Sequence, residues 1–468
     1  MQNEARFENP FFRQLGYAIW GVMLVLALVF YKERAFFMDA GFQLFNLINE
    51  ETIQVYHYRF ITGVPQLLPF VLLKMSAPLW LLAMSFSAAY ILFYAAVYHL
   101  LVRQLKNDYL GWALIFLFTL ISLDTFYHIQ SEFYLGLSLL LLVFGLVWRY
   151  PAMREKWMFP LLLPLLVTVG FSHKLSLIYF LFFWIFSGLK NGALRHKRYA
   201  AFLLLMLAIA AVKSIWFTGW YEAAKQVDFK NNWAEYFPGF HTIPANTVFL
   251  ERSLHHYYML PLMLAIVTVF YFYKKQWLKI FLVWGFSGGY LLLYNISDPH
   301  APYRFYSEVT YLPLSLFVAL PFLFDLVPEW QHSVRWKKWL PLAFVGVMAL
   351  RLITIGWNHQ TFDRQFSWIE NQMKKGRTIG TNRFLLPSRF VPMDTVLMTW
   401  GVPFTAMHLS ALEHPDSAKT LLILPSFERY EKEMKGNRYF LSPFKAMDLE
   451  ELNQRYYNPG PGEYFLLK

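Results

Sequence analysis

Long apolar segments recur along the chain and are separated by short polar ones. They cover about 16–31, 79–101, 109–123, 133–148, 157–171, 175–189, 199–216, 257–273, 277–295, 307–325 and 339–356. A helix needs roughly 20 mostly apolar residues to cross a bilayer, so the pattern predicts an all-α polytopic membrane protein with about eleven spans. The segments 157–171 and 175–189 are short, and one interrupted hairpin over 157–189 is the alternative to two spans.

The predicted loop after the first span, residues 32–78, contains two further apolar stretches. Residues 40–48 have an amphipathic pattern that predicts a juxtamembrane helix. The stretch "VPQLLPFVLLKM", 64–75, is too short to cross and contains two prolines, which indicates a re-entrant or interfacial helix. A second long loop, 217–256, is rich in aromatic residues that are typical of an interfacial belt.

The tail has a different pattern from the rest of the chain. The stretches 395–400 and 421–425 predict short strands, and 402–413 and 448–457 predict helices. We therefore expect a membrane domain over 1–356, and a small α/β appendage over 357–468.

Composition and charge narrow the class of protein. The chain is 57% hydrophobic, with 15% charged residues against about 25% in average globular proteins, which excludes an ordinary soluble enzyme. It has no cysteine, which excludes disulfides and thiolate chemistry. Most basic loop residues fall in short loops on the side of the N-terminus, so the net charge of +12 indicates topology and not nucleic-acid binding. We expect a cytoplasmic N-terminus, an extracytoplasmic appendage and a bacterial inner membrane location.

Ionisable residues collect in the predicted outer loops. They are Asp39 after the first span, His128 and Glu132 in "SLDTFYHIQSE", His173 and Lys174 in "FSHKLS", and His300, Arg304 and Tyr306 in "SDPHAPYRFYSE". Charges within or beside membrane helices are costly and usually functional. Their occurrence on one side predicts a shared outward-facing cavity that binds substrate.

Simpler explanations exist for most of these residues. Asp39 could cap the following helix, and His128 with Glu132 could form a pair on one helix face. His173 and Lys174 could satisfy a polar turn. Arg304 is the strongest candidate because a guanidinium at a helix mouth suits bidentate phosphate binding.

Two kinds of catalytic centre have no matching motif. The sequence has no HExxH motif, which would indicate a metal site. A divalent cation held by carboxylates beside a phosphate is the one cofactor that we consider. The sequence also has no GxSxG motif, which would indicate a serine nucleophile.

The layout resembles the GT-C superfamily of integral-membrane glycosyltransferases, which includes protein O-mannosyltransferases and aminoarabinose transferases. The resemblance is carried by Asp39 in "FFMDAGFQLF", by the long first outer loop and by "YRFYSEVTYLPLSLF" at 303–317. It implies that Asp39 is the base acting on the acceptor and that Arg304 engages the donor phosphate. The chain departs from the paired acidic residues of that family, because Ala40 follows Asp39.

The expected function is therefore inverting transfer of a sugar from a polyprenyl-phosphate donor to a lipid, glycan or protein acceptor at the outer face, within membrane lipids. A transporter or flippase for a lipid-linked or anionic substrate is the main alternative, but it would be expected to show repeat symmetry, which we do not find by inspection. An O-antigen polymerase or ligase is a further alternative and would favour large late outer loops.

Overall fold

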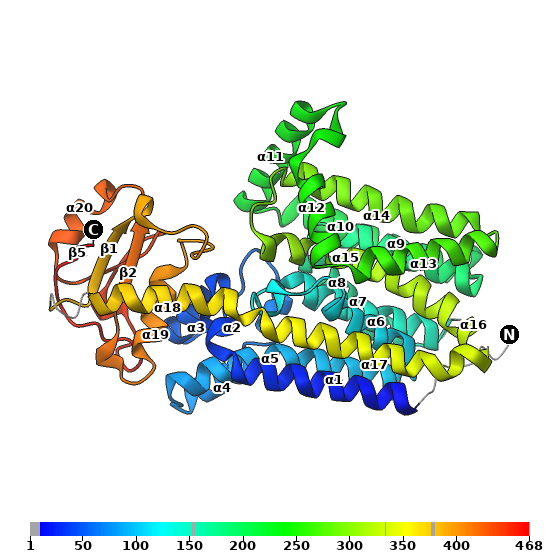
Figure 1. Cartoon of the computed structure of the whole chain (residues 1–468), viewed down its shortest axis with the longest axis horizontal. Helices are drawn as coiled ribbons and strands as arrows, with labels where there is room; N and C mark the ends of the chain where they lie inside the picture. Colours follow the sequence, from blue (N-terminus) through cyan, green and yellow to red (C-terminus); the bar gives the residue numbers. More distant parts are fainter. Residues whose placement is uncertain (1–9, 152, 154, 333, 376–379, 468) are drawn as a thin grey trace.

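The computed structural model describes residues 10–151, 153, 155–332, 334–375 and 380–467. A bundle of long helices forms most of the molecule, and a small domain with the β-strands lies beyond one end of the bundle (Figure 1). The first described residues lie at the other end of the bundle (Figure 1). The polar arm 1–9, which we expect in the cytoplasm, falls outside the described residues.

Each predicted span contains a helix. These helices are α1 (Pro10–Val29), α5 (Leu79–His99), α6 (Asp108–Thr119), α7 (Glu132–Arg149), α8 (Met158–Ser172), α9 (Ser176–Asn191), α10 (Lys197–Trp216), α13 (Met259–Tyr273), α14 (Trp277–Ser297), α15 (Arg304–Pro321) and α17 (Val334–Trp357). In the described part of the chain, seven helices are long and apolar enough to cross a membrane, and the bent pair α12 (Pro244–His255) and α13 would make an eighth. The helices α6, α8 and α9 are shorter. A polytopic helical protein is thus supported, while the count of eleven crossings stays a prediction.

The helix α15 forms the centre of the bundle. It contacts α6, α7, α13 and α14, and 94% of its apolar window is buried, against 28–33% for α1, α10, α14 and α17. After its polar first turns α15 is mainly apolar, as expected for a helix that is buried on all sides. The first turn of α15, which contains Arg304 and Tyr306, consequently lies among the loops at one end of the bundle.

The loop between α1 and α5 contains three α-helices, α2 (Tyr31–Phe36), α3 (Met38–Glu50) and α4 (Leu67–Lys74). The predicted helices at 40–48 and 64–75 are confirmed as α3 and α4. Val71 of α4 is exposed, as expected for an interfacial helix that is too short to cross. Most residues of α3 are buried, because this helix packs against α19 (Val402–Ala411) of the small domain.

The small domain is built around two small sheets. Parallel strands occur in the order β2 (Thr420–Leu424), β1 (Arg383–Pro387) and β5 (Phe465–Leu466), and β3 (Tyr439–Leu441) pairs antiparallel with β4 (Ala446–Asp448). The helix α18 (His359–Lys375) leads from α17 to this domain (Figure 1). The remaining α-helices are α11 (Trp220–Tyr236), which follows α10 along the chain, α16 (Val327–His332) and α20 (Glu431–Lys435).

The predictions for the tail are partly confirmed. The strand at 421–425 and the helix at 402–413 correspond to β2 and α19. The strand predicted at 395–400 is wrong, because the Leu397 amide donates to Gln365 Oε1 on α18 instead of joining a sheet. The helix predicted at 448–457 is also wrong, since it is reduced to one turn at Leu449–Glu451.

The small domain is docked on the start of α3. The Thr405 hydroxyl donates to the Phe36 carbonyl at 2.7 Å. A Cβ on Gly401 would lie 2.9 Å from Met38 Cα, so only glycine permits this approach. Met38 itself has a φ of 48°, which is uncommon for a residue with a side chain. The small domain therefore packs against an unusual backbone turn that directly precedes Asp39.

Candidate active site

Asp39 lies in the first turn of α3, where its carboxylate faces α15. The cap position of α3 is Phe37 and not Asp39, so the simple capping explanation does not describe its side chain. Asp39 Oδ2 accepts a hydrogen bond of 3.2 Å from the Tyr306 hydroxyl. The Asp39 side chain is 37% exposed, which leaves it accessible to a substrate.

The environment of Asp39 makes it more basic than an ordinary aspartate. Although over a third of the side chain is exposed, the surrounding protein desolvates the carboxylate and raises its pKa from 3.8 to about 6. The hydrogen bond from Tyr306, the charge of Arg59 and the backbone amide of Asp39 itself act in the opposite direction and limit this rise. At neutral pH Asp39 is mainly ionised, and its pKa suits a general base.

His128 borders Asp39 as a neutral ring. Its Nε2 lies 3.7 Å from Asp39 Oδ2, and its side chain is only 3% exposed. Burial lowers its pKa to about 4, so the imidazole is uncharged at neutral pH and the contact is not an ion pair. Its Nδ1 has no hydrogen-bond partner among the described residues. The ring packs edge-on against Phe37 and Tyr306.

Arg59 is the cation of this site, and the sequence analysis did not single it out. Its Nη1 lies 2.5 Å from Glu132 Oε1, and both side chains are largely buried. The four-residue spacing of His128 and Glu132 had indicated a pair between these two residues. Glu132 instead pairs with Arg59. Arg59 Nε has no hydrogen-bond partner within the described chain. We call Asp39, Arg59, His128, Glu132 and Tyr306 the Asp39 cluster.

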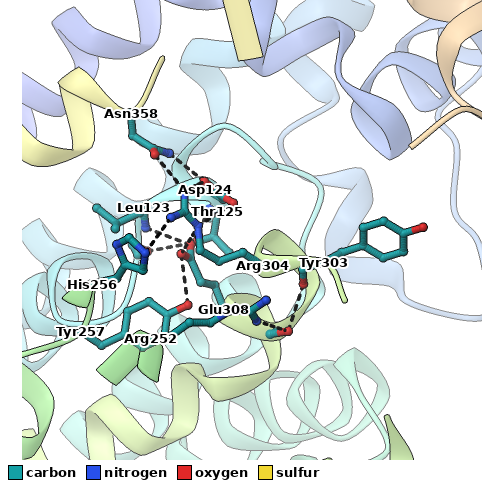
Figure 2. Close-up of polar contacts among 12 residues, drawn as sticks. Leu123, Asp124, Thr125, Arg252, His256, Tyr257, Tyr303, Arg304, Glu308 and Asn358 are labelled. Atoms are coloured by element: carbon teal, nitrogen blue, oxygen red, sulfur yellow. Dashed lines mark hydrogen bonds and ion pairs between the residues drawn. The ribbon is translucent and has the colours of Figure 1, made fainter. Parts of the chain in front are cut away.

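Arg304 belongs to a second group, drawn in Figure 2. Its Nε donates to Asp124 Oδ2 at 2.9 Å and its Nη2 donates to Asp124 Oδ1, which makes a bidentate ion pair. Asn358 Oδ1 accepts from Nη2 at 2.9 Å, and His256 Nε2 lies 3.3 Å from Nη1. With Glu308, these residues form what we call the Arg304 network.

Glu308 connects this network to the backbone before His128. Its Oε2 accepts from the amides of Leu123 and Thr125, both at 2.9 Å, and its Oε1 accepts from the Tyr257 hydroxyl (Figure 2). The His128 amide in turn donates to the Asp124 carbonyl at 3.0 Å. The Arg304 network thus fixes the segment that places His128 beside Asp39.

Five of the eight predicted site residues therefore fall into these two groups, and His173, Lys174 and His300 belong to neither. Asp39, His128, Glu132 and Tyr306 come together, whereas the donors of Arg304 are directed to protein acceptors. His173 Nδ1 accepts from the Leu175 amide at 3.1 Å, which is the turn that the simpler explanation predicted. Burial holds its pKa well below the usual value. Lys174 and His300 are exposed.

No sequence signal pointed to Arg59, because it was one of several basic residues in a predicted outer loop. Its importance follows only from its place next to Glu132 and Asp39. In the described part of the chain no group of three or more His, Asp or Glu residues could hold a metal ion. The divalent cation considered above stays a prediction.

Comparison with protein-family models, curated proteins and solved structures gave no match for this chain. The similarity to GT-C enzymes therefore depends on the residues quoted above. Any assignment of function must follow from the geometry and chemistry of the two groups of residues.

Proposed function

We propose that this protein is an inverting, polyprenyl-phosphate-dependent membrane glycosyltransferase with Asp39 as its base. One observation carries the proposal: a partly exposed carboxylate with a pKa of about 6 is hydrogen-bonded to Tyr306 and lies in the field of Arg59. The described chain also has helices long enough to cross a membrane, which suits a lipid-linked donor. Acceptor-dependent release of polyprenyl phosphate from a polyprenyl-phosphate sugar by the purified protein tests it.

The proposed reaction is a single displacement. The acceptor hydroxyl gives its proton to Asp39 while its oxygen forms a bond to C1 of the sugar. The bond from C1 to the phosphate oxygen breaks, and the phosphate leaves with the electron pair. This mechanism needs one base and one cation that stabilises the leaving group.

Arg59 is the better candidate for that cation. Arg304 already uses its donors on Asp124, Asn358 and His256, and a phosphate would have to displace these partners. Arg59 Nε is buried and has no hydrogen-bond partner among the described residues, and the charge of Arg59 acts on Asp39. A guanidinium in this place can stabilise a phosphate by its charge without losing its own carboxylate partner, Glu132.

The pH dependence of transfer tests the state of Asp39. We expect kcat/KM to fall as the pH is lowered through about 6, because only the ionised carboxylate accepts a proton. Tyr306→Phe removes a hydrogen bond that favours the ionised form, so the acid limb should move to higher pH. The measurement is transfer of radiolabelled sugar in nanodiscs between pH 4.5 and 8.

A matched control is available for this experiment. The Tyr294 hydroxyl donates to Asp298 Oδ2 at the same distance of 3.2 Å, but the pair lies outside the Asp39 cluster. Tyr294→Phe should leave the pH profile unchanged. A Tyr306→Phe profile that matches the wild type, or moves to lower pH, would contradict the assignment of the acid limb to Asp39.

Removal of the Arg59 charge tests donor binding. Arg59→Gln should raise KM for the donor by about 10- to 100-fold, since a hydrogen bond to a charged group contributes roughly 1.5–3 kcal/mol. Lys74→Gln is the control, because Lys74 is a basic residue of the same loop and pairs with Glu51 away from Asp39. Steady-state kinetics with varied donor measure the effect. An unchanged donor KM in Arg59→Gln would exclude Arg59 as the phosphate ligand.

A further inference from the structure

An apolar groove of about 660 Å³ lies between α9 and α14. Its lining includes Ile178, Ile185 and Leu189 from α9, and Gly285, Phe286 and Gly289 from α14. Its volume falls in the range of about 300–1,000 Å³ that is usual for small-molecule sites. Only 33% of the apolar window of α14 is buried, so this helix lies at the lipid-facing edge of the bundle.

The groove exists because two glycines leave it open. A Cβ added to Gly285 or to Gly289 would meet no atom within 4 Å. The neighbouring Gly288 is equally free of contacts but does not line the groove. A Cβ can therefore be added at all three positions without a clash, which makes the groove testable by substitution.

Basic residues surround one end of the groove. Lys190 follows the lining residue Leu189, and Lys279 follows Leu278. Both ammonium groups bind Asp325, with Nζ to Oδ distances of 3.0 Å and 2.7 Å, so two positive charges share one carboxylate. Three further basic residues lie within three positions of the lining residues Leu194 and Leu278 and are exposed, namely Arg195, Lys197 and Lys275.

We propose that this groove binds an anionic glycerophospholipid. An acyl chain fills the apolar part between α9 and α14, and the phosphate lies at the basic end. An apolar groove alone would accept the acyl chain of any lipid, whereas the excess positive charge selects a headgroup with a net negative charge. The basic end lies where α14 begins after α13, at the end of the bundle away from α3 (Figure 1), and the groove does not depend on the proposed transferase activity.

Lipid retention by the intact purified chain tests the proposal. Native mass spectrometry from detergent, with added phosphatidylglycerol or phosphatidylcholine, should show preferential binding of phosphatidylglycerol by the wild type. Gly285→Leu/Gly289→Leu should abolish this binding by filling the groove, and Gly288→Leu should retain it. Arg195→Gln/Lys197→Gln/Lys275→Gln should weaken phosphatidylglycerol binding by about fivefold for each charge that contacts the headgroup, and leave phosphatidylcholine unchanged.

Several results would overturn the proposal. Equal binding of the two lipids by the wild type would remove the role of charge, and undiminished binding by the double leucine variant would place the lipid elsewhere. A wild-type dimer that the leucine pair converts to a monomer, with lipid binding intact, would make the groove a contact between two copies of the chain. If the leucine pair lowers the melting temperature, Gly285→Ala and Gly289→Ala are used in its place, with Gly288→Ala as control.

Discussion

Asp39→Asn is expected to reduce sugar transfer by at least about 100-fold, because general bases contribute roughly 10²- to 10⁴-fold to the reactions they catalyse. Asparagine has nearly the same shape and can still accept the hydrogen bond from Tyr306. It cannot take a proton from the acceptor hydroxyl. Single-turnover transfer from a radiolabelled polyprenyl-phosphate sugar in nanodiscs measures the loss without interference from product release.

The stability of this variant separates chemistry from folding. The folded-state pKa of about 6 is above the ordinary value of 3.8, so folding disfavours the ionised carboxylate. The resulting cost appears as the pH rises from about 4 to 6 and persists at neutral pH. A neutral asparagine should therefore leave the melting temperature at pH 7 unchanged or higher.

Asp298→Asn provides the matched control for the Asp39 experiment. Asp298 also accepts a hydrogen bond from a tyrosine, at 3.2 Å, and lies outside the Asp39 cluster. It should retain full transfer. Turnover by Asp39→Asn that is close to the wild-type rate would disprove the base assignment and, with it, the main support for the proposed function.

Arg304→Gln is expected to destabilise the protein by about 3–5 kcal/mol, the usual cost of breaking a buried ion pair from one side. Asp124 is only 4% exposed and would lose its bidentate partner. The buried Glu308, 3.6 Å from Arg304 Nε, would lose the same positive charge. Chemical denaturation in detergent, followed by fluorescence, measures the loss.

A second substitution distinguishes a structural Arg304 from a phosphate ligand. Arg304→Gln/Asp124→Asn removes both charges of the pair and keeps hydrogen-bonding groups for Asn358. If Arg304 has the structural role that we describe, this double variant should recover much of the stability and bind donor with a nearly normal KM. Recovered stability with a donor KM that is still raised would instead restore Arg304 as the phosphate ligand.

Local pattern was sufficient to predict most of the helical architecture. The apolar segments predicted a helix at every expected span, and the short segment 64–75 became the short helix α4. This agreement has a physical cause, because membrane-spanning backbone must satisfy its hydrogen bonds internally, and a continuous apolar run of sufficient length permits only a helix. In the small domain, where solvent also accepts hydrogen bonds, the predicted strand at 395–400 was wrong.

The sequence by itself determined which residue types lie near the ends of the helices, including Asp39, His128 and Tyr306. Only the tertiary structure decided their partners. Arg304 pairs with Asp124 across 180 positions of the chain, and Glu132 pairs with Arg59 and not with His128 four residues away. A charge in a poorly solvated place takes the nearest group that neutralises it, and that group is set by which helices and loops meet in space, a property that no local pattern contains.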